Sequence, residues 1–167
     1  MKYRDRFTDE DWTGVLEAPI LAGLAITAAD PGGLVSAVKE SAAMARTLKD
    51  AAAAAGDGAL VTEIAEAYRD AADRDAASDA VKAMAKGQSP EALLSASVAR
   101  LGAVMRTVET ALPEQAGAFR AFLLDVAQKT AEASREGGFL GFGGEKVSEA
   151  ERKALDQIAA VLAAPAA

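Results

Sequence analysis

Two residue types with distinctive chemistry, cysteine and histidine, are missing from this 167-residue chain. Without cysteine the chain has no disulfides, thiol nucleophiles, Fe–S clusters or thiolate zinc sites. Without histidine it lacks the usual general base near neutral pH, which excludes a Ser-His-Asp triad, an HExxH site and a histidine-ligated haem. We therefore expect no cofactor, and any bound metal must be an oxygen-ligated divalent cation such as Mg²⁺, Ca²⁺ or Mn²⁺.

Basic residues are also scarce relative to acidic ones. The chain has 18 Lys and Arg against 25 Asp and Glu, which gives a net charge of −7. The basic residues are interleaved with acids, whereas proteins that bind phosphate backbones cluster their Lys and Arg. We predict no binding to nucleic acid and no attachment to an anionic membrane surface.

No hydrophobic run is long enough to suggest a membrane protein. The N-terminal stretch MKYRDRFTDEDW lacks the apolar region of a signal peptide. The most hydrophobic segment, Ala18 to Ala29, is shorter than the roughly 20 residues that a membrane-spanning helix needs. The sequence therefore predicts no membrane span, and we expect a cytoplasmic protein of bacterial type.

Strand signals are missing as well. Aromatic residues make up 5% of the chain, and no segment alternates β-branched or aromatic residues with polar ones. Alanine, the best helix former, supplies about a quarter of the residues. We predict an all-α protein: a single compact multi-helix bundle of about seven helices without β-sheet. The domain spans residues 1–167, with 1–7 and 163–167 frayed.

Several helix boundaries can be predicted from the first half of the chain. Thr8 is placed to cap a first helix, because acids follow it. Pro19 either kinks that helix or begins a second one. Gly56 is the expected end of the next helix, and another begins near Ala59. The run from Arg69 to Asp79, in which charged residues alternate with alanine, is interpreted as a solvated helical face with a break near Asp75 to Ser78.

The second half carries clearer start signals. Ser89-Pro90 places a capping hydroxyl before a proline at the first helical position. Pro113 separates one helix from the next, and the helix after it runs to about Arg135. Ser148 and Glu151 have the spacing of a capping box before the last helix.

The glycine-rich segment Gly137 to Lys146 is the most distinctive stretch of the chain. Its residue order matches neither a Walker A loop nor GxGxxG, and no strand precedes it. Its backbone N–H groups can still cradle an anion beside the helix that follows. The structural alternative is that its apolar residues tuck onto the bundle. If exposed, they are a binding site for a protein partner or for self-association; these residues are Phe139, Leu140 and Phe142.

Acidic side chains offer a second kind of candidate site. Asp30 and Glu40, or Glu145, Glu149 and Glu151, can supply oxygen ligands to a hard cation. The EF-hand spacing is absent, and the capping box already accounts for Glu151. Unpatterned acids in an acidic protein are more often solvated than ligating.

The first hairpin, DWTGVLEAPILAGLAITAADPGG, and the last, GGEKVSEAERKALDQIAAVL, resemble the tellurite-resistance TerB-like family of small helical bacterial proteins. The resemblance implies a role in stress-response complexes, with divalent cations held by acidic side chains in some members. The positions that match the family's pattern are Trp12, Pro19, Asp30, Glu40, Ser148 and Glu151.

These observations favour a non-catalytic accessory or protein-interaction protein. The alternative is a TerB-like stress-response protein that binds a hard divalent cation or an anion near the glycine-rich loop 137–151. An enzyme that uses carboxylate chemistry is a third possibility, because paired carboxylates need to be close only in space.

Overall fold

A computed structural model of the chain describes residues 2–29, 37–56, 59–135 and 147–164, with only the backbone described for 37–43 and 134–135. The described residues contain no strand, which confirms the predicted all-α class. They form one short 3-10 helix and seven α-helices: η1 (Tyr3–Arg6), α1 (Asp9–Ala29), α2 (Ala37–Ala55), α3 (Leu60–Ala67), α4 (Ala71–Ala85), α5 (Pro90–Ala111), α6 (Pro113–Arg135) and α7 (Glu149–Ala163).

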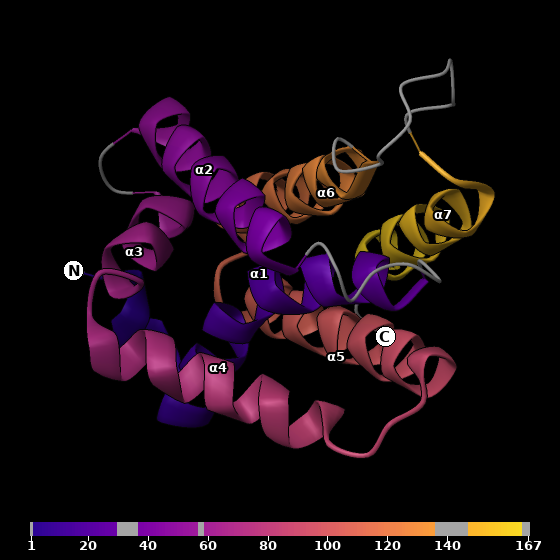
Figure 1. Cartoon of the computed structure of the whole chain (residues 1–167). Coiled ribbons are helices and arrows are strands. Elements are labelled where there is room, and N and C mark those ends of the chain that lie inside the picture. Colours follow the sequence, from indigo (N-terminus) through magenta and orange to yellow (C-terminus); the bar gives the residue numbers. More distant parts are fainter. Residues whose placement is uncertain (1, 30–36, 57–58, 136–146, 165–167) are drawn as a thin grey trace.

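Helix α1 is the central element of the bundle (Figure 1). Its buried residues do not form a single stripe but cover most of the helix circumference, so neighbours must pack on several sides of it. Helices α4, α5, α6 and α7 all contact it. The buried residues of α1 are Trp12, Gly14, Val15, Leu16, Glu17, Ala18, Pro19, Leu21, Ala22, Ala25 and Ile26.

Pro19 lies inside α1, and the helix continues through it, so no second helix begins there. A proline inside a helix cannot donate a backbone hydrogen bond, and its ring disturbs the preceding turn. The hydroxyl of Tyr68 donates a hydrogen bond of 2.6 Å to the carbonyl of Leu16 in that turn. The residue after α3 therefore supports the part of α1 that the proline weakens.

The predicted break near Asp75 to Ser78 is wrong, because α4 runs unbroken through these residues. The chain turns instead at Arg69 and Asp70, where the Asp70 carboxylate accepts a 2.8 Å hydrogen bond from the N–H of Ala72. Ala77 is fully buried, so packing holds the helix together where its sequence pattern is weakest.

The other predicted boundaries are confirmed. The hydroxyls of Thr8 and Ser89 accept hydrogen bonds from the first turns of α1 and α5. Both bonds of the capping box at Ser148 are present. The chain leaves α2 through Gly56, whose φ of 76° favours glycine.

The N-terminal segment is tied to the bundle, which differs from the fraying that the sequence suggested. The carboxylate of Glu63 in α3 accepts hydrogen bonds from the N–H groups of Tyr3 and Arg4, at 2.8 and 3.0 Å. The ring of Phe7 packs beside Trp12 in the core, with ring centroids 6.1 Å apart. Glu63 is 60 residues away from Tyr3 in the sequence, so the local sequence pattern could not predict that it holds the N-terminal segment.

A partly buried ion pair joins α1 to α5, with the Arg100 side chain 39% exposed. The guanidinium of Arg100 donates two hydrogen bonds to the Glu17 carboxylate, at 3.0 and 3.4 Å, and the Glu17 side chain is 8% exposed. The hydrogen bond to Glu17 raises the pKa of Arg100 above its ordinary value. Gly14 leaves room for this arrangement, because a Cβ there would lie 3.3 Å from the Arg100 guanidinium.

By length and composition, α1 is also the one helix among the described residues that could cross a membrane. Its mean hydropathy over the relevant window is 1.4, and 61% of that window is buried by the rest of the protein. The core helix of a soluble protein and an N-terminal signal sequence both meet the same criteria, so these criteria alone do not make α1 a membrane span.

Gly102 allows α5 and α7 to pack closely, and this contact generates a stability prediction. A Cβ at Gly102 would lie 2.4 Å from Cγ2 of Val161, whereas a Cβ at Gly117 in α6 would meet nothing within 4 Å. We expect Gly102→Ala to lower the free energy of unfolding by about 1–3 kcal/mol through overpacking. Gly117→Ala should raise it by about 0.4–1 kcal/mol, because alanine restricts the unfolded chain.

Urea denaturation of both variants beside the parent tests this prediction. Because both substitutions add the same methyl group inside a helix, they differ mainly in what that group meets. Equal shifts for the two variants would contradict the close approach of α5 and α7.

Candidate functional site

Most of the residues predicted to form a metal or partner site lie outside the described residues. This applies to Asp30, Glu145, Phe139, Leu140 and Phe142, while Glu40 belongs to α2 with its side chain outside the description. The cation site and the interaction surface of the glycine-rich loop therefore stay predictions.

Two predicted ligands, Glu149 and Glu151, have described side chains. Glu149 forms an exposed ion pair of 2.9 Å with Lys153, whereas Glu151 has a structural role. It is 1% exposed, and its carboxylate accepts a 2.7 Å hydrogen bond from the N–H of Ser148. This bond closes the capping box at the start of α7. Within the described residues no group of three acids is placed to hold a metal ion.

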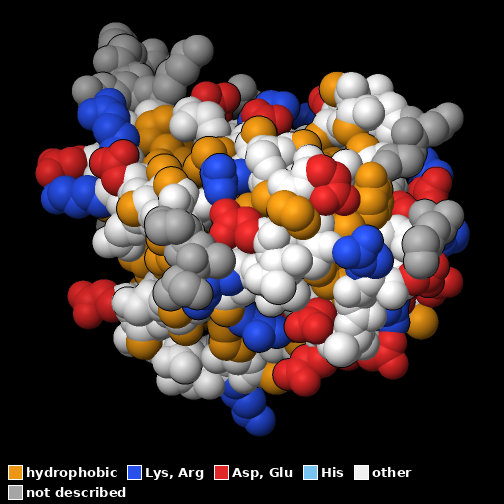
Figure 2. Space-filling view, turned by 180° about the vertical axis from the view of Figure 1, so that it is seen from behind, with side chains coloured by type: hydrophobic (Ala, Val, Ile, Leu, Met, Phe, Trp, Pro, Cys, Tyr) orange, Lys and Arg blue, Asp and Glu red, His pale blue; other side chains and the backbone are white. Residues whose placement is uncertain are grey.

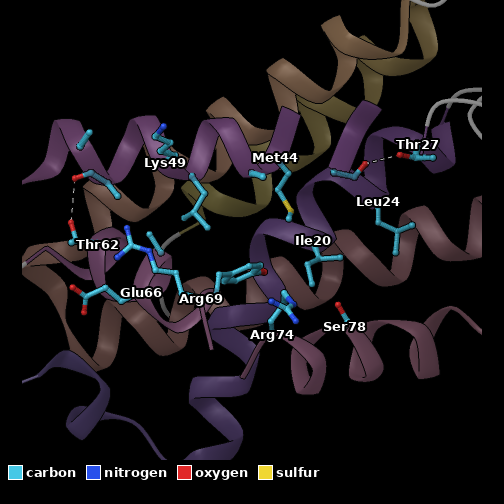
Figure 3. Close-up of a pocket in the computed structure, with 17 residues that line it drawn as sticks. Ile20, Leu24, Thr27, Met44, Lys49, Thr62, Glu66, Arg69, Arg74 and Ser78 are labelled. Atoms are coloured by element: carbon cyan, nitrogen blue, oxygen red, sulfur yellow. Dashed lines mark hydrogen bonds between the residues drawn. The ribbon is translucent and has the colours of Figure 1, made fainter. Parts of the chain in front are cut away.

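A cavity of about 930 Å³ lies between α1, α2, α3 and α4 (Figure 3). Ile20 and Leu24 of α1 lie one turn apart and form its floor, and Met44 and Leu48 of α2 lie one turn apart on the opposite wall. Its lining also includes Gly23, Thr27, Ala45, Lys49, Ala52, Ala53, Thr62, Ala65, Glu66, Tyr68, Arg69, Arg74 and Ser78. The cavity volume falls within the range of about 300–1,000 Å³ that small-molecule sites occupy.

Tyr68 forms part of the wall beside α3. Burial is the main reason that the pKa of its hydroxyl rises well above the usual value of 10, and the nearby Glu17 carboxylate adds to the shift. A hydroxyl that stays protonated and donates to the Leu16 carbonyl is engaged in holding α1 and α3 together. Tyr68 therefore contributes shape to the cavity rather than acid–base chemistry.

Two threonine hydroxyls on the wall are engaged with backbone carbonyls, and Ser78 adds a further hydroxyl to the lining. Thr27 donates to the carbonyl of Gly23 at 3.1 Å, and Thr62 donates to the carbonyl of Gly56 at 2.8 Å. These bonds leave the charged side chains as the main polar groups available to a ligand.

The charged groups of the lining are mostly cationic. Lys49, Arg69 and Arg74 line the cavity together with one acid, Glu66, and all four residues are exposed, which places them at its open rim. This balance is opposite in sign to that of the whole chain, whose net charge is −7. On the face seen in Figure 2, by contrast, side chains of both charges are interspersed. The cavity is therefore a local cationic region in an acidic protein.

Sequence reasoning missed this site for two reasons. The alternation of Arg69 and Arg74 with acids and alanines was interpreted only as a solvated helical face, although both arginines line the cavity. Ile20 and Leu24 have the spacing of ordinary core residues. The two arginines that flank the α3–α4 corner could have suggested a cationic site. The sequence could not show that they lie near α2, because that distance depends on the fold.

Comparisons of the chain with protein-family models, with curated proteins and with solved structures found no significant match. The resemblance to the TerB-like family therefore stays a prediction, and the candidate site rests on its own geometry.

The buried hydroxyl of Tyr68 generates a prediction about pH. Because the folded-state pKa is raised, its contribution to stability is fully present below pH 10 and is lost as the pH rises toward the folded value. Tyr68→Phe should lower the free energy of unfolding at pH 7 by about 0.5–1.5 kcal/mol, through loss of the bond to Leu16. It should also weaken the decline in stability above pH 10.

Urea denaturation at pH 7, 9, 10 and 11 measures both effects. A variant whose stability declines with pH as steeply as that of the parent would show that Tyr68 is not responsible for the alkaline loss.

Proposed function

We propose that this protein is a non-catalytic binding protein that holds a small apolar molecule in the cavity between α1, α2, α3 and α4. The observation that supports the proposal is the cavity itself: about 930 Å³ of space with an apolar floor and wall. The side chains that give it this character are Ile20, Leu24, Met44 and Leu48.

The gain from filling such a space is comparable in size to the cost of association. Burying each CH₂ group contributes about 0.8 kcal/mol, so a chain of roughly eight carbons offsets a sizeable part of the cost of association. Tyr68 is held by its bond to α1, and the threonine hydroxyls by bonds to helix carbonyls, so part of the wall is preorganised. Preorganisation reduces the ordering cost that a ligand must overcome.

The groups on the wall favour holding a ligand over transforming it. The lining has one carboxylate, Glu66, so a second acid for paired-carboxylate catalysis is not among the described lining residues. The cationic groups present can orient a ligand without reacting with it. A binding role also agrees with the accessory function that the sequence favours.

Filling the cavity with a larger side chain tests the proposal. Ala52 lies on the α2 wall, and Ala121 is exposed on α6 away from the cavity. We expect the neutral dye N-phenyl-1-naphthylamine to bind the parent with enhanced fluorescence. Ala52→Phe should weaken binding about tenfold or more, since occluding contact with two CH₂ groups costs about that factor.

Ala121→Phe is the matched control, because it adds the same ring outside the cavity, and circular dichroism checks that both variants stay helical. Dye titration that gives the same dissociation constant for the parent and both variants would contradict binding in this cavity.

A further inference from the structure

We infer that the ligand of this cavity is an anionic amphiphile, whose oxyanion head group lies at the cationic rim that carries Arg69 and Arg74 and whose apolar chain lies against Ile20, Leu24, Met44 and Leu48. The inference rests on the proposed binding function and specifies its ligand class. A single alkyl chain with a carboxylate, sulfate or phosphate monoester head has the required chemistry.

The two arginines are positioned by the corner between α3 and α4. Arg69 follows the end of α3, and its N–H donates to the Glu66 carbonyl at 3.0 Å. Arg74 lies near the start of α4, and its N–H donates to the Asp70 carbonyl at 3.2 Å. Figure 3 shows the two arginines at separate places along the cavity: Arg69 extends toward Thr62 and Glu66, and Arg74 lies beside Ile20. The corner therefore places two exposed guanidinium groups at the rim of an apolar space.

These guanidinium groups are not engaged in strong ion pairs with the described residues. Arg74 is 3.4 Å from the carboxylate of its neighbour Asp75, and the two side chains are 47% and 66% exposed. Exposed ion pairs contribute little to stability, so a ligand anion can replace the Asp75 carboxylate as the partner of Arg74. Across the residues that the structure describes, Arg69 and Lys49 form no ion pair within 4.0 Å.

The contrast with other arginines of the protein strengthens this point. Arg100 is bound to Glu17 through two hydrogen bonds, and Arg120 donates to Glu109 and to the Leu162 carbonyl. Those guanidinium groups join helices, whereas Arg69 and Arg74 border open volume.

Guanidinium groups suit an oxyanion because their planar donors match its geometry and they remain charged at all physiological pH values. The nearby apolar wall offers no comparable partner for such a charge. A ligand that satisfies both regions must combine an anionic head with an apolar body. A neutral apolar molecule would leave the cationic side unused, and the single carboxylate of Glu66 is outnumbered as a partner for a cationic head.

A matched series of eight-carbon ligands tests the inference: octanoate, 1-octanol and octyltrimethylammonium, each titrated below its aggregation limit at pH 7 and low ionic strength. The protein variants are the parent, the double variant Arg69→Gln/Arg74→Gln, and Arg46→Gln. Arg46 is exposed on α2 and does not line the cavity, so its substitution controls for a change in net charge. Isothermal titration calorimetry or protein NMR gives the dissociation constants.

We expect the parent to bind octanoate about tenfold or more tightly than 1-octanol. A hydrogen bond to a charged group contributes enough free energy for a factor of about that size. Octyltrimethylammonium should bind most weakly. The double variant should bring octanoate and 1-octanol to similar affinity while 1-octanol binding is retained, and Arg46→Gln should keep the preference of the parent.

Equal binding of octanoate and 1-octanol by the parent would overturn the anionic head group and leave the apolar cavity proposal standing. Absence of binding for the whole series would overturn both. The comparison of ligands on the parent does not depend on whether the double variant folds.

Discussion

The need to cover α1 is the constraint on which the rest of the structure depends. Apolar side chains occupy most of its circumference, so the helix is stable in water only when others surround it. Three contacts show how closely they do so. Gly14 lies against Arg100 and Val104 of α5, Gly23 lies beside Thr130 of α6, and Tyr68 bonds to the Leu16 carbonyl.

The cavity lies where this covering is incomplete. Ile20, Gly23, Leu24 and Thr27 remain partly exposed on the side of α1 that looks toward α2 and α4. Figure 1 shows these two helices separated, with α3 joining them at one end. The sequence supplies apolar residues to that side of α1, and the fold leaves them facing space instead of another helix. An exposed apolar floor of this kind carries a free-energy cost that a ligand removes.

The charges divide into those that fix the bundle and those that border the cavity. Glu17, Glu63 and Glu151 are engaged with Arg100, with the N-terminal segment and with the α7 cap, respectively. Arg69 and Arg74 have no such task among the described residues. In this division, three acids join parts of the bundle, while two arginines at one corner remain available to the proposed ligand.

Local signals in the sequence predicted the fold class and most helix ends, because a capping hydroxyl or a glycine acts on the residues beside it. Thr8, Ser89 and Ser148 are of this kind. The α3–α4 corner was misplaced because burial of Ala77, a long-range effect, keeps α4 helical through a weak pattern. The cavity was missed for the same reason, since its lining comes from four helices.

The central claim is that an anionic amphiphile lies in the space between α1 and α2. The methionine methyl groups report on it directly, because Met44 lines the cavity while Met105 is fully buried in α5 away from it. With methionine methyl ¹³C labelling and octanoate present, we predict a shifted Met44 signal with intermolecular NOEs to the alkyl chain, and an unchanged Met105 signal. An unshifted Met44 methyl at saturating octanoate, or NOEs only to methyl groups outside the cavity, would contradict the account.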